Sequence, residues 1–155
     1  MARRETQTVQ SRINSDNMAV GFTVKYYWYQ IGTGDFLYSF FSTIAVNLEK
    51  RKWGSLFPCI MNDLYNGDLP QEKLQTALDE LEEITVKLQA FSPDKVVWDF
   101  DKLEKRPPWG DNINSEITDL SNYFVTSDGE DLITILHHAI EKGMALGQNV
   151  KITKM

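Results

Sequence analysis

The alternation of side chains between Ala19 and Ile31 restricts the possible folds more than any other feature of the sequence. Apolar and aromatic residues occupy every second position on one side of this stretch: Val20, Phe22, Val24, Tyr26 and Trp28. A repeat of two residues is typical of a β-strand with one covered face, because successive side chains point to opposite sides. The sequence therefore predicts a strand over residues 19–31, and the rest of the chain must supply further strands and a covering layer.

Helical periodicity begins directly after this stretch. A Gly32–Asp35 turn interrupts the alternation, and Thr33 or Asp35 is expected to cap the helix that follows. Apolar residues then recur at helical spacing, which predicts an amphipathic helix over residues 36–51. Pro58 is expected to open a short helix that ends near Tyr65.

Two longer helices are predicted in the second half of the chain. The first begins at Pro70, which is tolerated in a first helical turn, and ends before Ser92–Asp94. The second is expected from about Asp128 to Leu146, because Ser127–Glu130 has the Ser-x-x-Glu pattern of a capping box. Gly147 is the expected stop of this helix.

Three further short strands complete the predicted architecture. They are expected at residues 95–100, 123–126 and 150–153, where β-branched and aromatic residues gather. The predicted order is β-α-α-α-β-β-α-β. The fold class is therefore α/β (α+β), with a two-layer domain in which about four strands are covered by three main helices.

Charge and composition divide the chain into a short leader and a body. Residues 1–17 are polar and carry a net charge of +1. The remaining residues carry a net charge of −7, so the whole chain has a net charge of −6. We expect residues 1–17 to be a disordered leader or a non-native extension, and residues 18–155 to form one domain. An acidic body disfavours direct binding of nucleic acid and favours a basic partner.

Targeting signals and cysteine usage indicate a cytoplasmic protein. Cys59 is the only cysteine, so no disulfide can form within the chain. The N-terminal residues lack the apolar core of a signal peptide, and no apolar run approaches the roughly 20 residues that span a bilayer. The expected location is the cytoplasm, without membrane association.

The sequence contains no established catalytic pattern, and no cofactor is expected. His137 and His138 are neighbours, which on a helix point about 100° apart and cannot bind one ion together. The alternative that stays open is a small metal- or nucleotide-dependent hydrolase that would use Asp111, Asp119 and the Gly32–Asp35 turn. It requires these carboxylates to meet in one cleft.

Candidate partner-binding residues gather in aromatic loops and on one acidic helix. The stretch 107–113 mounts Trp109 between prolines and a glycine, and residues 118–129 follow it with the expected strand and cap. The helix over residues 70–92 carries a cluster of four acidic residues away from its apolar stripe: Asp79, Glu80, Glu82 and Glu83. The candidate interface residues are Trp53, Asp79, Glu80, Glu83, Trp109, Asp111, Asn112 and Tyr123.

Three blocks of sequence resemble the immunity protein 70 family of bacterial polymorphic toxin systems. They are residues 30–41, with the run Gln30-Ile31-Gly32-Thr33-Gly34-Asp35-Phe36; residues 53–58, with Trp53-Gly54-Ser55; and residues 107–129, with Pro107-Pro108-Trp109-Gly110-Asp111. The resemblance covers about Val20 to Ile152. It implies a cytoplasmic antitoxin that is not an enzyme and that binds and blocks a cognate toxin C-terminal domain, such as a basic nuclease.

The resemblance and the residues agree on a protein that acts through binding. The expected mechanism is stoichiometric occlusion of the toxin, with acidic residues steering the encounter and aromatic residues slowing dissociation. A general protein-interaction module has the same surface properties and is the second alternative. The sequence leaves the oligomeric state open.

Overall fold

The computed structural model describes residues 19–154, and the expected leader at residues 1–17 lies outside the described residues. The strands are β1 (Ala19–Val24), β2 (Tyr27–Thr33), β3 (Asp68–Leu69) and β4 (Val150–Lys154). The α-helices are α2 (Gly34–Asn47), α3 (Leu74–Leu88) and α4 (Leu132–Leu146). Short helices cover Cys59–Leu64 (η1, a π-helix), Gln71–Lys73 (η2) and Pro93–Lys95 (η3).

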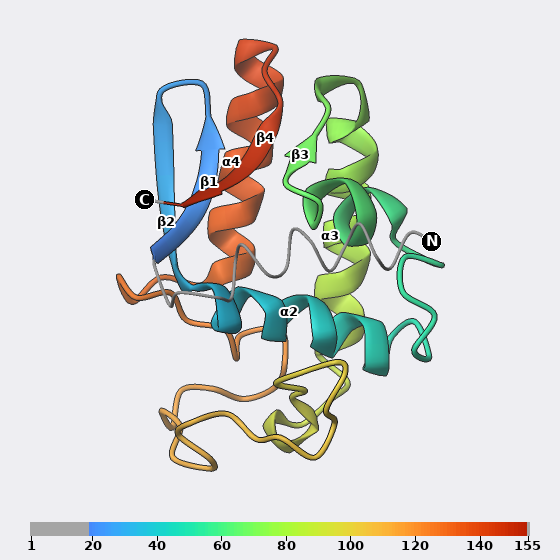
Figure 1. Ribbon diagram of the computed structural model, residues 1–155, viewed down its shortest axis with the longest axis vertical. Helices are drawn as coiled ribbons and strands as arrows, with labels where there is room; N and C mark the ends of the chain where they lie inside the picture. The colour runs from blue at the N-terminus through green and yellow to red at the C-terminus, as the bar shows by residue number, and fades with distance from the viewer. Residues whose placement is uncertain (1–18, 155) are drawn as a thin grey trace.

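The four strands form one antiparallel sheet in the order β2-β1-β4-β3. Helix α4 contacts β1, β2 and β4 on one face of this sheet, and α3 packs beside α4 (Figure 1). Helix α2 crosses the end of the sheet beneath them. The predicted class, a four-stranded sheet with three main helices, is confirmed.

The alternation over residues 19–31 belongs to a hairpin of two strands, where one strand was predicted. The chain turns at Lys25 and Tyr26, and Val24 pairs with Tyr27. Lys25 has a φ of 54°, in a left-handed region that side chains other than glycine seldom adopt. The turn lacks the Asn-Gly or Asp-Gly signal of a short hairpin, and alternation continues through it.

Two predicted strands do not form. Residues 95–100 begin with the end of η3 and continue as turns and coil, and residues 123–126 contribute only an isolated bridge between Val125 and Asp131. The sheet instead includes β3, which pairs Asp68 and Leu69 with β4. Two residues are too few to give an alternating pattern, so the sequence did not predict β3.

The predicted helix ends are partly confirmed. The Thr33 side chain accepts a hydrogen bond from the N–H of Phe36, as expected of the α2 cap, and Gly147 ends α4 with a φ of 64°. The prediction that Ser127–Glu130 forms a capping box for this helix is wrong. The cap is Asp131, whose carboxylate accepts from the N–H of Thr134, because Thr126 and the Glu130 backbone first close a tight turn.

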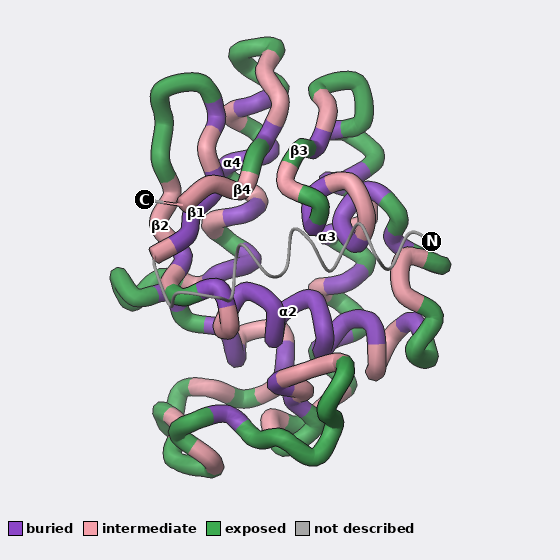
Figure 2. Tube along the Cα trace, in the orientation of Figure 1, coloured by how far each residue is buried: buried purple, intermediate pink, exposed green. Residues whose placement is uncertain are grey.

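The core lies between the sheet, the three α-helices and η1. Every residue from Leu37 to Ala45 is buried, which is unusual for a helix whose sequence is amphipathic. Figure 2 shows this helix buried along most of its length. Helix α2 stops at Asn47, four residues before the predicted end, since Lys50 and Arg51 adopt positive φ values of 53° and 67°.

Candidate partner-binding site

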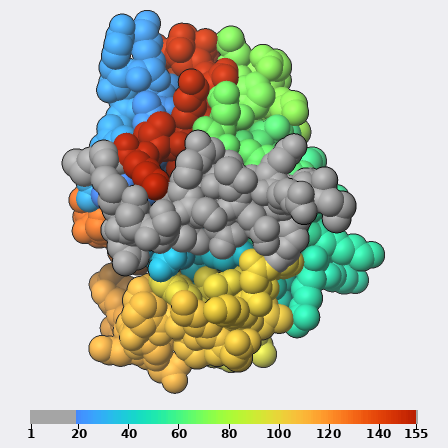
Figure 3. Space-filling model, in the orientation of Figure 1, coloured from blue at the N-terminus to red at the C-terminus, as the bar shows by residue number. Residues whose placement is uncertain are grey.

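Residues 96–131, here called the loop segment, contain no helix or strand and form one end of the molecule (Figures 1 and 3). The segment lies against α2 on the side away from the sheet. The remaining described residues, 19–95 and 132–154, are here called the body. Helix α2 is therefore covered by the sheet layer on one side and by the loop segment on the other.

Buried hydroxyl groups of α2 hold the start of the loop segment. Ser39 Oγ donates to the carbonyl oxygen of Val97 at 2.7 Å. Thr43 Oγ1 donates to the same carbonyl at 3.1 Å and accepts from the Val97 N–H at 3.0 Å. Ser42 Oγ accepts from the Phe100 N–H at 3.2 Å. These three buried polar residues explain why α2 can be buried on both sides, because each one has a hydrogen-bond partner.

Trp109 lies exposed on the loop segment and is held by two other aromatic residues. Its indole N–H donates to the Tyr123 hydroxyl at 2.8 Å. Its ring packs edge-on against Trp98, with a centroid separation of 5.3 Å. The tryptophan is 37% exposed while Trp98 and Tyr123 are buried. The ring is thus fixed in position before any partner arrives, which lowers the entropy lost on binding.

Asp111 and Asn112 are exposed beside Trp109, as the sequence indicated. A hollow of about 160 Å³ adjoins Asp111 and is bordered by Pro93, Asp94, Val96, Arg106, Gly110, Ile113 and Tyr123. Burial raises the pKa of the Tyr123 hydroxyl, and Asp111 adds to this rise, while the Trp109 hydrogen bond and Arg106 oppose it. Tyr123 is therefore a neutral hydroxyl at neutral pH, and its oxygen accepts from the Trp109 indole.

The loop segment is acidic from Pro107 onward. Between residues 107 and 131 there is no lysine or arginine, and the acidic residues are Asp111, Glu116, Asp119, Asp128, Glu130 and Asp131. The exposed aromatic ring of Trp109 therefore lies in a sequence stretch whose charged residues are all acidic, although Arg106 borders the hollow next to it. Such a surface attracts a basic partner and repels phosphate backbones.

Asp119 stabilises a turn of the loop segment. Its carboxylate accepts hydrogen bonds from the N–H and hydroxyl of Ser121 and from the Thr118 hydroxyl. Burial opposes ionisation of Asp119, but these hydrogen bonds outweigh it and lower its pKa. Asp119 is occupied as a capping residue, and no group of three or more potential metal ligands occurs within residues 19–154. The geometry therefore offers the hydrolase alternative no support.

Trp53 is directed into the body. Its indole N–H donates to the Met61 carbonyl at 2.7 Å, and its ring packs against Tyr38, Tyr65 and Phe100. The residue is half-buried and all of these contacts are internal. We therefore treat Trp53 as a packing residue, one of the two roles that a tryptophan in a glycine-containing turn commonly has.

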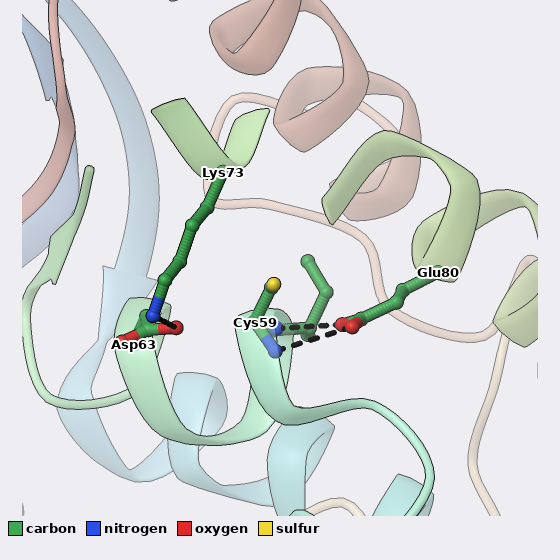
Figure 4. Close-up of polar contacts among 5 residues, drawn as sticks. Cys59, Asp63, Lys73 and Glu80 are labelled. Atoms are coloured by element: carbon green, nitrogen blue, oxygen red, sulfur yellow. Dashed lines mark hydrogen bonds and ion pairs between the residues drawn. The ribbon is translucent and has the colours of Figure 1, made fainter. Parts of the chain in front are cut away.

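The acidic residues of α3 divide into an exposed pair and an inward one. Asp79 accepts from Gln75, and Glu83 pairs with Lys87 at 2.8 Å, both on the exposed side. Glu80 instead points at the start of η1, where its oxygens accept from the N–H groups of Cys59 and Ile60 (Figure 4). Burial raises the pKa of Glu80, although the two amides oppose this rise. Glu80 thus belongs to the body's internal contacts.

Two residues of the site were missed by sequence reasoning. Trp98 was assigned to a strand, yet it supports Trp109, and Arg106 borders the hollow beside Asp111. The spacing of eleven residues between the two tryptophans has no periodic meaning, so only the folded chain reveals their contact. No helix formed by residues 19–154 has both the length and the apolar character needed to cross a lipid bilayer.

Comparison with known protein families gives a match. The family described as Immunity protein 70 matches residues 22–152, a range that contains all the described helices, β2 and β3, and parts of β1 and β4. Neither a curated protein nor a solved structure matches the chain.

Proposed function

The chain belongs to the immunity protein 70 family, and we propose from this premise that it binds a cognate toxin domain and blocks it by stoichiometric occlusion. The proposed contact surface is the loop segment around Trp109, Asp111 and Asn112. The exposed acids Asp79 and Glu83 of α3 would assist the approach of a basic toxin. The protein acts in the cytoplasm in this proposal, without direct contact with nucleic acid.

The observation that carries the proposal is the fixed, exposed ring of Trp109 in an acidic surround. Tryptophan residues dominate many protein interfaces because a large ring is buried at low entropic cost. Trp98 and Tyr123 supply this rigidity here. A contact of this kind resists dissociation, whereas the surrounding carboxylates accelerate association.

The experiment measures binding between the full chain and the toxin domain encoded beside its gene. We expect Trp109→Ala to weaken affinity by about 30-fold, mainly through faster dissociation, as for a typical hot spot. Asp111→Lys is expected to weaken affinity by about tenfold, mainly through slower association that depends on salt. Toxin protection assays in cells provide the second readout.

Matched controls separate the site from general surface effects. Glu72→Lys makes the same charge change on an exposed residue of η2, and Leu56→Ala removes a side chain that is 51% exposed elsewhere. Both controls should bind as the unchanged protein does. A folded Trp109→Ala/Asp111→Lys variant that binds and protects normally would remove the loop segment from the interface. Failure of the unchanged chain to bind or protect would overturn the proposed function itself.

A further inference from the structure

Strand β2 forms an edge of the sheet and exposes part of its backbone. Among residues 19–154 it pairs with β1 alone, across a turn of two residues. Val24 and Tyr27 close this turn as a hydrogen-bonded pair, so Tyr27 and Tyr29 bond to β1 while the residues between and after them face outward, up to the register shift opposite Val20 and Gly21. Trp28 and Gln30 therefore turn their N–H and C=O groups away from the sheet. The loop segment covers the edge from Ile31, whose carbonyl accepts from the Ser127 N–H at 3.0 Å, and the Gln30 side chain donates to the Ser127 hydroxyl at 2.8 Å.

This edge lacks the usual protection against pairing. Residues 27–33 read YWYQIGT and contain no charge and no proline. Natural sheet edges commonly carry lysine, proline or inward-pointing charges, which discourage a second strand from adding. Tyr26, Tyr27 and Trp28 are 87%, 47% and 37% exposed, and such aromatic residues favour cross-strand contact. An unprotected aromatic edge of this kind is suited to strand addition.

The two ends of the exposed edge carry opposite charges. At the Tyr27 end, Lys25 lies over the Tyr26 ring and Lys142 lies 4.4 Å from the Tyr27 ring centroid. At the Ile31 end lies Asp128, next to the Ser127 that closes the edge. In antiparallel pairing of two identical strands, the lysine end of each copy meets the aspartate end of the other. The edge is therefore complementary in charge to itself, as a two-fold interface requires.

We propose that β2 pairs with β2 of a second copy of this chain, in antiparallel register about Tyr29. This register places Trp28 of each copy opposite Gln30 of the other, so all four outward-facing residues form hydrogen-bonded pairs. The two sheets join into one of eight strands. Elsewhere two copies with a net charge of −6 repel one another, but the edge itself is uncharged and its ends attract. The proposal goes beyond toxin binding and does not depend on it.

Sedimentation of the full chain across a concentration series tests the proposal. We expect a reversible monomer–dimer equilibrium. Trp28→Pro should weaken the dimer by about tenfold or more, because proline removes an outward N–H and no bond to β1. Trp28→Thr is the matched control: it keeps the N–H and removes the ring, and it should retain more of the dimer. Circular dichroism checks that each variant is folded.

A charge exchange supplies a test that leaves the backbone intact. Lys25→Glu/Lys142→Glu should weaken the dimer, since like charges then meet at both ends. Adding Asp128→Lys to that variant should restore it. A chain that stays monomeric at millimolar concentration overturns the proposal, as does a dimer that none of these changes affects. A monomer whose toxin affinity falls with Trp28→Pro would assign the edge to the toxin and also overturn it.

Discussion

The body and the loop segment are stabilised in different ways. The body buries apolar side chains on α2, α3, α4 and the sheet, and its largest fully buried residues include Tyr65, Phe22, Phe40 and Phe41. The loop segment has no regular backbone pairing, and most of its residues are exposed (Figure 2). It is held instead by particular hydrogen bonds to α2 and by a few buried rings such as Phe124.

The difference shows how a protein can combine a stable body with a changeable surface. Apolar burial in the body provides most of the stability, because it scales with the area removed from water. The loop segment depends on a small number of contacts with α2, so its exposed residues can be replaced without unfolding the body. Substitutions at contacts within the body should therefore lower the unfolding free energy more than substitutions at contacts of the loop segment.

The largest effect is expected in the body, at Glu49. This carboxylate is 2% exposed and accepts hydrogen bonds from the N–H groups of Gly54, Leu56 and Phe57. Glu49→Ala leaves three amides unpaired, and we expect a loss of about 4 kcal/mol in unfolding free energy. Urea denaturation measures it. Glu49→Gln, which retains one acceptor oxygen, should lose less; equal losses would show that packing, and not hydrogen bonding, is the cause.

A smaller effect is expected at the contact between body and loop segment. Thr43→Val keeps the shape of the side chain but removes both hydrogen bonds to Val97. We expect a loss of about 2 kcal/mol in unfolding free energy. Amide exchange should accelerate within residues 96–106 while β1 and α4 keep their protection. If exchange rises equally in the body, the two regions unfold as one unit, and the loop segment does not open independently of the body.

Within the loop segment, the effect on stability should be smaller still. Tyr123→Phe removes the acceptor of the Trp109 indole, and Trp109 is exposed enough to find water instead. We expect a loss of about 1 kcal/mol or less in unfolding free energy. Toxin affinity should fall more than stability does, because the ring is no longer fixed. Unchanged affinity in a calorimetric titration would show that this hydrogen bond does not position Trp109.

The reactivity of the buried Cys59 thiol measures how often the body opens, and no substitution is needed for this measurement. Burial, followed by the charge of Glu80 and a hydrogen bond to it, raises the pKa of the Cys59 thiol to about 11. The thiol is therefore protonated at neutral pH and should react slowly with thiol reagents. Its contribution to stability is present below pH 9 and is lost as the pH approaches 11. Glu80→Gln should lower this pKa, which the pH profile of labelling measures.

Sequence reasoning succeeded where the signal is local. The Thr33 cap, the apolar stripe of α3 and the Gly147 stop depend on neighbouring residues, and all three are confirmed. It failed where distant contacts decide. Residues 95–100 look like a strand, but hydrogen bonds from α2 hold Val97 and Phe100 as coil.

The candidate interface residues remain a prediction, and the structure shows which of them are exposed. Trp109, Asp111 and Asn112, which are interface candidates, are exposed in a turn that contains two prolines and a glycine. Glu80 was placed on a solvated helix face and Trp53 had either a core or an interface role, and both make internal contacts. Nothing in a helical pattern distinguishes an acid that faces water from one that accepts hydrogen bonds from another helix.

The contacts of Ser39 and Thr43 have a consequence for evolution. Both hydroxyl groups bind the main chain of Val97, and every amino acid except proline offers the same N–H and C=O groups. The attachment is therefore indifferent to the side chain at that position. Substitutions further along the loop segment therefore leave its attachment at Val97 unchanged. An immunity protein built in this way can change its exposed residues as the toxin changes and keep the same fold.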